Sequence, residues 1–378
     1  MKMRILGSTK INSIPNKEEI LKLGGYAAGI CYMRGNINEI LNEDNEKTLR
    51  RIKNTISSGH HSVYGHFYLN IYLENIPKIL AMILNNEKAY NTSEKSARYT
   101  KMNIIGKEKE LYAKWVKLFF ENIKFKYPNF NDNQIEKLSM ENARYLISIF
   151  TPSTSLLYTV EYRQLNYLLY WCKNFIENQK NDDFYIKIKD VLKKFVELFN
   201  SYIQIDLNTE NKNRRLSLFA IRHRKEEWGE NYSTNYFATF SQLAQAQRHR
   251  TINYEMQNIL QNKFYVPKII KNTVLEDEWL KDINSIEYPQ GKIVKVNERG
   301  TYENFISKCE ERLCGTAQLE IMEQTRKTLV NYINGVEDYN YAVYHALKKY
   351  DTNGPRCTFG WKCIKPCAFG KAAFERDV

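Results

Sequence analysis

The residues best suited to ligand chemistry are Arg248, His249 and Arg250, which follow the weakly apolar segment 241–247. Two guanidinium groups beside an imidazole suit a phosphate or an anionic ring system, because a guanidinium donates paired hydrogen bonds to such groups. A solvated basic helix end is the alternative, since cations are also favourable near the last carbonyl groups of a helix. The triplet alone does not decide between these two interpretations.

A degenerate counterpart of this region lies earlier in the chain. His223 precedes Arg248 by 25 residues, and His61 precedes Asn86 by the same interval. In this alignment residues 86–88, Asn-Glu-Lys, stand where the second region has its basic triplet. An offset that holds from the histidine to the triplet predicts an internal repeat. Chance similarity between two helical segments is the alternative.

The elements that position these residues include both helices and strands. Residues 67–73 alternate between apolar and polar, which predicts a half-buried strand. Residues 76–84 are predicted to be a helix that follows this strand, and 3–6 are predicted to be an opening strand. Further helices are predicted at 17–31, 46–56, 107–122, 135–150 and 185–202. The polar composition around 204–215 predicts a domain boundary there.

Length and charge restrict the class of protein. A chain of 378 residues predicts one large or two moderate domains. The net charge of +13 favours anionic partners, but the charge is spread along the chain, so nucleic acid is not the expected partner. The first residues lack the apolar core of a signal peptide, and 76–84 is too short to span a bilayer. With seven cysteines in such a chain, we expect a cytoplasmic protein with reduced thiols.

Two motifs of the first half resemble a known family. Residues 59–66 read Gly-His-His-Ser-Val-Tyr-Gly-His, and 94–99 read Glu-Lys-Ser-Ala-Arg-Tyr. Together with the Arg-His-Arg triplet, these motifs resemble the signature of the flavin-dependent thymidylate synthases. The first half lacks the triplet, whereas the second half has Asn258 and Leu260 in place of the motif's serine and arginine.

The resemblance implies an α+β fold with mixed helices and antiparallel sheet, present as two diverged copies. We expect a nucleotide-binding copy at 1–205, a flavin-binding copy at 206–335, and a C-terminal helix with a Cys-rich tail at 336–378. Each half retains what the other has lost, which predicts one composite site. Active sites in this family form from several subunits, so we expect a homodimer that forms a pseudo-tetramer.

The reaction that the resemblance implies is reductive methylation of dUMP to dTMP. The carbon would come from methylenetetrahydrofolate, a folate, and the hydride from FAD that NADPH has reduced. No nucleophilic cysteine is needed, because the flavin supplies the redox chemistry. Two alternatives remain open. One is the same flavin chemistry on another pyrimidine nucleotide, and the other is a non-catalytic nucleotide- or RNA-binding module.

The resemblance also assigns roles to individual residues. Arg312, Arg144 and Ser96 are the expected catalytic residues. The pyrimidine nucleotide is expected to contact Glu94, Ser96, Arg98, Tyr99, Arg144 and Arg312. FAD is expected to contact His61, Ser62, Arg248, His249, Arg250, Asn297, Arg299 and Asn304. An interhelical salt bridge is the alternative for Arg144 and Arg299, and a hydrogen-bonded histidine is the alternative for His61.

The Gly- and Pro-containing tail holds three of the cysteines, Cys357, Cys363 and Cys367. With Cys314 as a fourth thiolate, or Cys309 in its place, they could hold zinc in a closed tetrahedral site. Their spacing is not that of a standard Cys-x-x-Cys pair. Ordinary reduced cysteines are the alternative.

Overall fold

The computed structural model describes residues 2–8, 15–31, 33, 37–96, 100, 102, 104–207, 214–364 and 366–378. The chain forms two compact units: Met1–Lys95 with Pro152–Ser217, and Ser96–Thr151 with Leu218–Val378. Each unit combines helices with an antiparallel sheet, so the predicted α+β class is confirmed. In the described part of the chain, no helix is long and apolar enough to cross a membrane.

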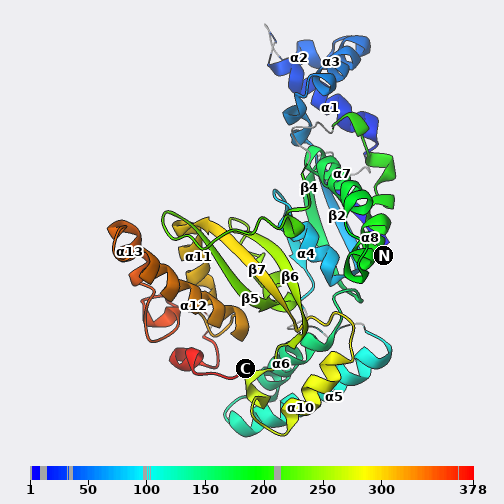
Figure 1. Ribbon diagram of the computed structural model, residues 1–378. Coiled ribbons are helices and arrows are strands. Elements are labelled where there is room, and N and C mark those ends of the chain that lie inside the picture. Colours follow the sequence, from blue (N-terminus) through cyan, green and yellow to red (C-terminus); the bar gives the residue numbers. More distant parts are fainter. Residues whose placement is uncertain are drawn as a thin grey trace. The chain divides into compact units, whose positions relative to one another are not determined.

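The first unit contains a four-stranded antiparallel sheet in the order β1-β2-β4-β3. Its strands β2 and β4 are labelled in Figure 1. The predicted strand at 67–73 is confirmed, because Leu69, Ile71 and Leu73 are fully buried and alternate with more exposed neighbours. The predicted helix at 76–84 is also confirmed, and it begins directly after β2 at Lys78. The strands are β1 Lys2–Ser8, β2 Tyr68–Pro77, β3 Asn91–Glu94 and β4 Pro152–Glu161.

Helices cover this sheet. Helices α4 and α7 pack against the strands, and α8 packs against both of these helices. Gly25 lets α1 approach α3 closely, since a Cβ there would lie 2.8 Å from Ile52. The helices of this unit are α1 Lys17–Ile30, α2 Ile37–Leu41, α3 Asn45–Ser57, α4 Lys78–Asn86, α7 Tyr162–Asn178 and α8 Asp183–Glu197.

The second unit contains a three-stranded antiparallel sheet in the order β5-β7-β6. Two apolar clusters flank it, one with Trp115 against Trp279 at 4.9 Å between ring centroids, and one with Tyr232 against Tyr332. The strands are β5 Asn231–Thr239, β6 Asn253–Phe264 and β7 Lys292–Thr301. The helices are α5 Gly106–Lys126, α6 Asp132–Ala143, α9 Phe240–Ala246, α10 Leu275–Asn284, α11 Tyr302–Arg312, α12 Leu319–Val336 and α13 Tyr341–Lys348.

The helices predicted at 135–150 and 185–202 both end earlier than expected, the second at Glu197. The first prediction extended from 135 to 150, but α6 ends at Ala143. Beyond it the backbone pairs with residues 288–290: the carbonyl of Ile147 accepts from Gln290, and the N–H of Ile149 donates to Tyr288. The apolar residues of this segment fit a helix or an extended strand equally well, and the distant partner selects the extended form.

The chain passes from the first unit to the second at Ser217, close to the boundary expected around 204–215. Residues 96–151 lie inside the first predicted copy, but they pack with the second unit. Both units are therefore built from two separate stretches of chain.

The two units share an order of elements and a sheet topology. The first unit has the element order β2, α4, β3, β4 and α7, with an insertion between β3 and β4. The second unit has the order β5, α9, β6, β7 and α11, with an insertion between β6 and β7. In each, the third strand lies between the other two and leads directly into a helix. The registers agree as well, because Asn91 lies opposite Thr159 as Asn253 lies opposite Arg299.

Candidate functional site

The predicted triplet lies in the turn between α9 and β6 of the second unit. Arg248 and Arg250 are exposed, whereas His249 between them is buried. Asn304 on α11 donates from its amide to the carbonyl of Thr251 at 3.4 Å, which attaches the turn to that helix. The turn therefore presents two cations on either side of a buried imidazole.

His249 fixes the orientation of Arg312. The Nε–H of Arg312 donates to Nε2 of His249 at 2.7 Å. Burial lowers the pKa of His249 to about 2, with smaller contributions from the charges of Arg312 and Lys308. The imidazole is therefore neutral, its proton is on Nδ1, and its 3.8 Å approach to Glu311 is not an ion pair. His249 positions a guanidinium rather than transferring a proton.

The neutral, buried His249 predicts a loss of stability in mild acid. This histidine is protonated near pH 6.5 in the unfolded chain but only near pH 2 in the folded chain, so its contribution to stability falls as the pH drops below 6.5. From about pH 8 to about pH 5, the loss in the free energy of unfolding is about 2 kcal/mol. Urea unfolding at the two pH values should show a smaller loss for His249→Gln, and equal losses in both proteins would contradict the assignment.

One face of the β5-β7-β6 sheet is polar around Asn297. This residue lies opposite Asn235 on β5 and opposite Glu255 on β6. Its amide donates to Oγ of Ser233 at 3.0 Å and to Oδ1 of Asn235 at 3.2 Å. Its own Oδ1 is buried and has no partner among the described residues. Because buried acceptors are rarely left unpaired, this atom marks a place for a ligand donor.

Two arginines contact Glu255, and a third lies near one of them. Nη1 of Arg222 lies 3.1 Å and Nη2 of Arg299 lies 3.7 Å from Oε1 of Glu255. Burial and then the charge of Arg224 lower the pKa of Arg299. The Nε of Arg299 is buried without a partner within the described chain. One carboxylate cannot neutralise three guanidinium groups, so this cluster favours an anion.

Sequence reasoning found only part of this cluster. Arg299 was expected in the flavin site, and its contact with Glu255 matches the alternative of a salt bridge in part. Arg222 and Arg224 were missed. The only signal for them was the basic run at 222–225, which does not show which carboxylate the arginines meet.

Arg144 is a deeply buried cation of the expected nucleotide site. It is 4% exposed and begins the short 3-10 helix η2, Arg144–Leu146, directly after α6. Its Nε and Nη2 have no hydrogen-bond partner among the described residues. Unpaired buried donors on a charged group are costly, so this guanidinium indicates an anionic or strongly polar ligand.

A buried carboxyl group links the elements that carry Arg144 and the triplet. Glu320 on α12 accepts from the hydroxyl of Tyr145 in η2 at 3.0 Å and from the backbone N–H of Thr239 at 2.8 Å. Thr239 caps the start of α9. Burial raises the pKa of Glu320 to about 7, against the opposing effect of these hydrogen bonds. The network holds η2 at the start of α9.

Replacing Arg144 by methionine should separate ligand binding from folding. The loss of charge-assisted hydrogen bonds is expected to weaken nucleotide binding roughly tenfold to hundredfold. The ligand-free protein should be as stable as the wild type or more stable, because buried guanidinium N–H groups without hydrogen-bond partners are removed. Calorimetric titration and urea unfolding measure the two effects, and Arg326→Met, an exposed arginine on α12, is the control. A variant that unfolds more easily and binds normally would show a structural role.

His61, in the histidine motif of the first unit, makes hydrogen-bond contacts within the fold. His61 is buried, its Nδ1 lies 3.2 Å from the hydroxyl of Tyr167, and its Nε2 lies 3.0 Å from the carbonyl of Ile56. Both ring nitrogens are therefore used, as the alternative of a hydrogen-bonded histidine predicted. The neighbouring Ser62 is exposed.

The last family motif is described only in part. Nζ of Lys78 lies 2.7 Å from Oε1 of Glu94, which ties this carboxylate to the start of α4. The carbonyl of Ser96 accepts from the N–H of Thr100 at 3.1 Å. The expected nucleotide ligands Arg98 and Tyr99 lie outside the described residues.

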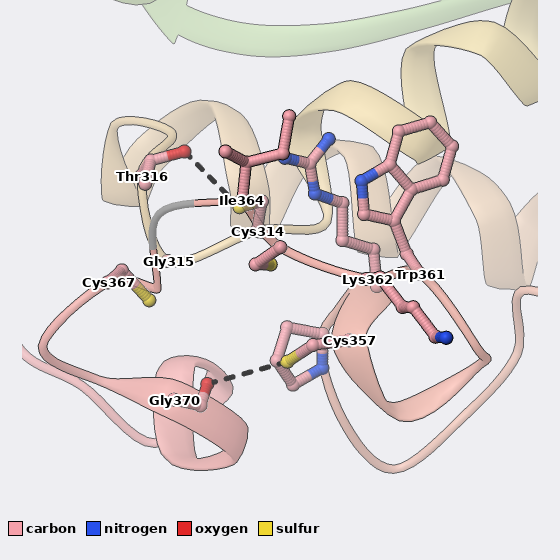
Figure 2. A pocket seen from close by; sticks show the side chains of 12 residues that line it. Cys314, Gly315, Thr316, Cys357, Trp361, Lys362, Ile364, Cys367 and Gly370 are labelled. Carbon is pink, nitrogen blue, oxygen red and sulfur yellow. Dashed lines mark hydrogen bonds between the residues drawn. The ribbon is translucent and has the colours of Figure 1, made fainter.

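The four cysteines of the predicted zinc site line one cavity of about 430 Å³ in the second unit. Figure 2 shows Cys314, Cys357 and Cys367 around it. Sγ of Cys314 lies 3.2 Å from the hydroxyl of Thr316, and Sγ of Cys357 lies 3.9 Å from the carbonyl of Gly370. Cys363 also lines the cavity. Among the described residues, no group of three or more His, Cys, Asp or Glu side chains is arranged to hold a metal ion. The four cysteines thus line one cavity, and the zinc site remains a prediction.

Comparison with known proteins finds a family similarity in the first part of the chain. Residues 13–171 match the family model Thy1, thymidylate synthase complementing protein. This part of the chain is similar to the Thy1 family. The match includes the motif at 94–99 and Arg144, and it ends before the triplet at 248–250. No curated protein matches the sequence.

Solved structures similar to this chain include flavin-dependent thymidylate synthase ThyX from Helicobacter pylori, complexed with FAD and dUMP. The identity is 13%, the match covers 54% of this chain and 100% of that chain, and the TM-score is 0.30. A UMP/dUMP methylase, PolB from Streptomyces cacaoi, bound with 5-Br dUMP, is also similar. Its identity is 14%, the match covers 53% of this chain and 96% of that chain, and the TM-score is 0.31.

Proposed function

We propose that the protein is a flavin-dependent thymidylate synthase-like enzyme that converts dUMP to dTMP with methylenetetrahydrofolate and NADPH. One observation carries the proposal. In the second unit, several arginines lack a full set of partners among the described residues. Arg144 is buried with unpaired donors, and Arg299 shares Glu255 with Arg222. The substrates of this reaction are a nucleotide monophosphate, a folate and a dinucleotide, all of which are anionic.

The residues near the triplet fit FAD. Arg248 and Arg250 are exposed cations suited to a pyrophosphate. Asn253, three residues after the triplet, lies opposite Arg299, so the triplet and the arginine cluster share one end of the sheet. The unpaired Oδ1 of Asn297 and Nε of Arg299 offer an acceptor and a donor. When bound, the flavin would supply the hydride transfer that side chains cannot perform.

Arg144 and Arg312 suit the pyrimidine nucleotide. As C5 of the ring becomes nucleophilic, negative charge develops on the ring oxygens, and fixed donors stabilise it without reorganisation. Arg312 is held by His249, which keeps its guanidinium oriented before the substrate arrives. In the overall reaction the methylene carbon and a hydride become the new methyl group, which replaces the proton on C5 of dUMP. Because NADPH supplies the hydride, the folate leaves as tetrahydrofolate.

We also propose that the chain is a fusion of two diverged copies of one fold. The common order of elements, the same arrangement of β2-β4-β3 and β5-β7-β6, and the matching register of Asn91 and Asn253 support this. The registers give the same alignment as the sequence, with Asn86 at the position of Arg248. Two such chains would form a pseudo-tetramer, whose mass light scattering can measure.

The test is purification followed by flavin analysis and an assay with dUMP, methylenetetrahydrofolate and NADPH. We expect bound or readily bound FAD, and dTMP that forms only when all three substrates are present. Methylation of UMP or dCMP in place of dUMP would favour the same chemistry on another pyrimidine nucleotide. A protein that binds nucleotides or RNA but no flavin would reject the proposal.

A further inference from the structure

The turn after α4 in the first unit is the counterpart of the triplet turn. An amide from the helix after the central strand supports each turn: Gln164 on α7 donates to the carbonyl of Lys88 at 2.8 Å, and Asn304 on α11 donates to Thr251. Their charges differ. Residues 86–88 carry one acid and one base, whereas 248–250 carry two arginines.

Glu87, at the position of His249, is fully buried and is held by the segment 214–217, which we call the connector. Nη2 of Arg214 lies 2.5 Å from Oε2 of Glu87, and the backbone N–H of Ser217 donates to Oε1 at 2.5 Å. The amide of Asn86 donates to Oγ of Ser217 at 2.7 Å. The connector thus contacts two residues of the degenerate triplet.

The guanidinium of Arg214 also lies over Trp171 on α7, 3.7 Å from the ring centroid, within the range of a cation–π contact. Trp171 and Cys172 are the tenth and eleventh residues of α7, as Glu311 and Arg312 are of α11. In the second unit Arg312 contacts His249. In the first unit Cys172 has replaced that arginine, and Arg214 supplies a guanidinium to Glu87 instead.

We infer that the connector permanently fills the first unit's counterpart of the flavin site, so that each chain binds one flavin, in the second unit. Arg214 neutralises Glu87 and covers Trp171, so of the triplet positions only Lys88 offers a cation, where the second unit has two arginines. A buried carboxylate at this position would also repel an anion. This inference rests on the proposed function, because it assumes that the triplet of the second unit binds flavin.

The experiment measures flavin per chain in the saturated full-length protein, and amide hydrogen exchange of peptides that cover 81–90. The variants are Arg214→Ala, its exposed neighbour Arg215→Ala as the matched control, and Arg248→Ala. We expect one flavin per chain in the wild type and in both connector variants. Arg248→Ala should bind flavin more than tenfold more weakly. The rate of amide hydrogen exchange at 86–88 should rise roughly tenfold in Arg214→Ala. It should not change in Arg215→Ala or Arg248→Ala.

Two flavins per chain, or one flavin that Arg248→Ala does not affect, would overturn the inference. Unchanged exchange in Arg214→Ala would also overturn it, because the connector would then not hold the turn. Absence of flavin from the wild type would instead reject the proposed function, and the exchange result would still decide whether the connector occupies this turn.

Discussion

Replacing Arg312 by alanine is expected to lower turnover by roughly 10²–10³-fold, the effect of removing one preorganised donor from a developing negative charge. The guanidinium is suited to this role because its Nε is bound to the neutral His249. Its side chain is 14% exposed, so it acts in a partly water-excluded environment. Steady-state and single-turnover assays with dUMP measure the effect, and a flavin titration should remain close to that of the wild type.

Two variants test whether the orientation of this arginine matters. Arg312→Lys keeps the charge but loses the planar fork, so it should recover only a small part of the activity. Glu311→Ala removes a neighbour that is 61% exposed and lies 3.4 Å from Nη2 of Arg312, and it should change turnover little. Equal losses of flavin binding and turnover in Arg312→Ala would show that the arginine supports the fold of the turn rather than the reaction.

Local sequence patterns predicted the elements that depend on local packing. The alternation around Leu69 and Ile71 predicted β2, because a strand with one buried face must have a period of two. The gap-free alignment placed Asn86 at the position of Arg248, and the sheet registers have the same alignment. The strand could be predicted because its burial pattern lies within one short stretch of chain, and the alignment could be made because each half keeps its own residue spacing.

Long-range partners could not be predicted in the same way. The end of α6 depends on the pairing of 147–149 with 288–290, which no local pattern reveals. In the sequence, Glu87 looks like a position where the triplet has been lost. In the structure it is buried against Arg214, more than a hundred residues away. For Arg222 and Arg224 the sequence shows the positive charge, but it does not show which carboxylate lies near them in the fold. A cation's partner depends on the tertiary fold, and charged residues have no period that identifies it.

Replacing Lys308 by methionine should destabilise the second unit by about 3–5 kcal/mol, because it leaves a buried carboxylate without its counter-ion. Lys308 on α11 lies 2.6 Å from Glu298 on β7, and both side chains are fully buried. The hydroxyls of Tyr232 and Tyr236 donate to the same carboxylate, at 2.8 and 2.6 Å. The pair thus fastens the helix that ends in Arg312 to the strand that carries Asn297 and Arg299.

The double variant Lys308→Met with Glu298→Gln should lose clearly less stability than Lys308→Met alone, since its amide oxygen still accepts from a tyrosine hydroxyl and no charge remains buried. Lys327→Met, an exposed lysine on α12, is the control and should change the free energy of unfolding by less than about 0.5 kcal/mol. Urea unfolding measures all three variants. If Lys308→Met were no less stable than the control, the ion pair would not hold β7 to α11, and the orientation of Arg312 would rest on His249 alone.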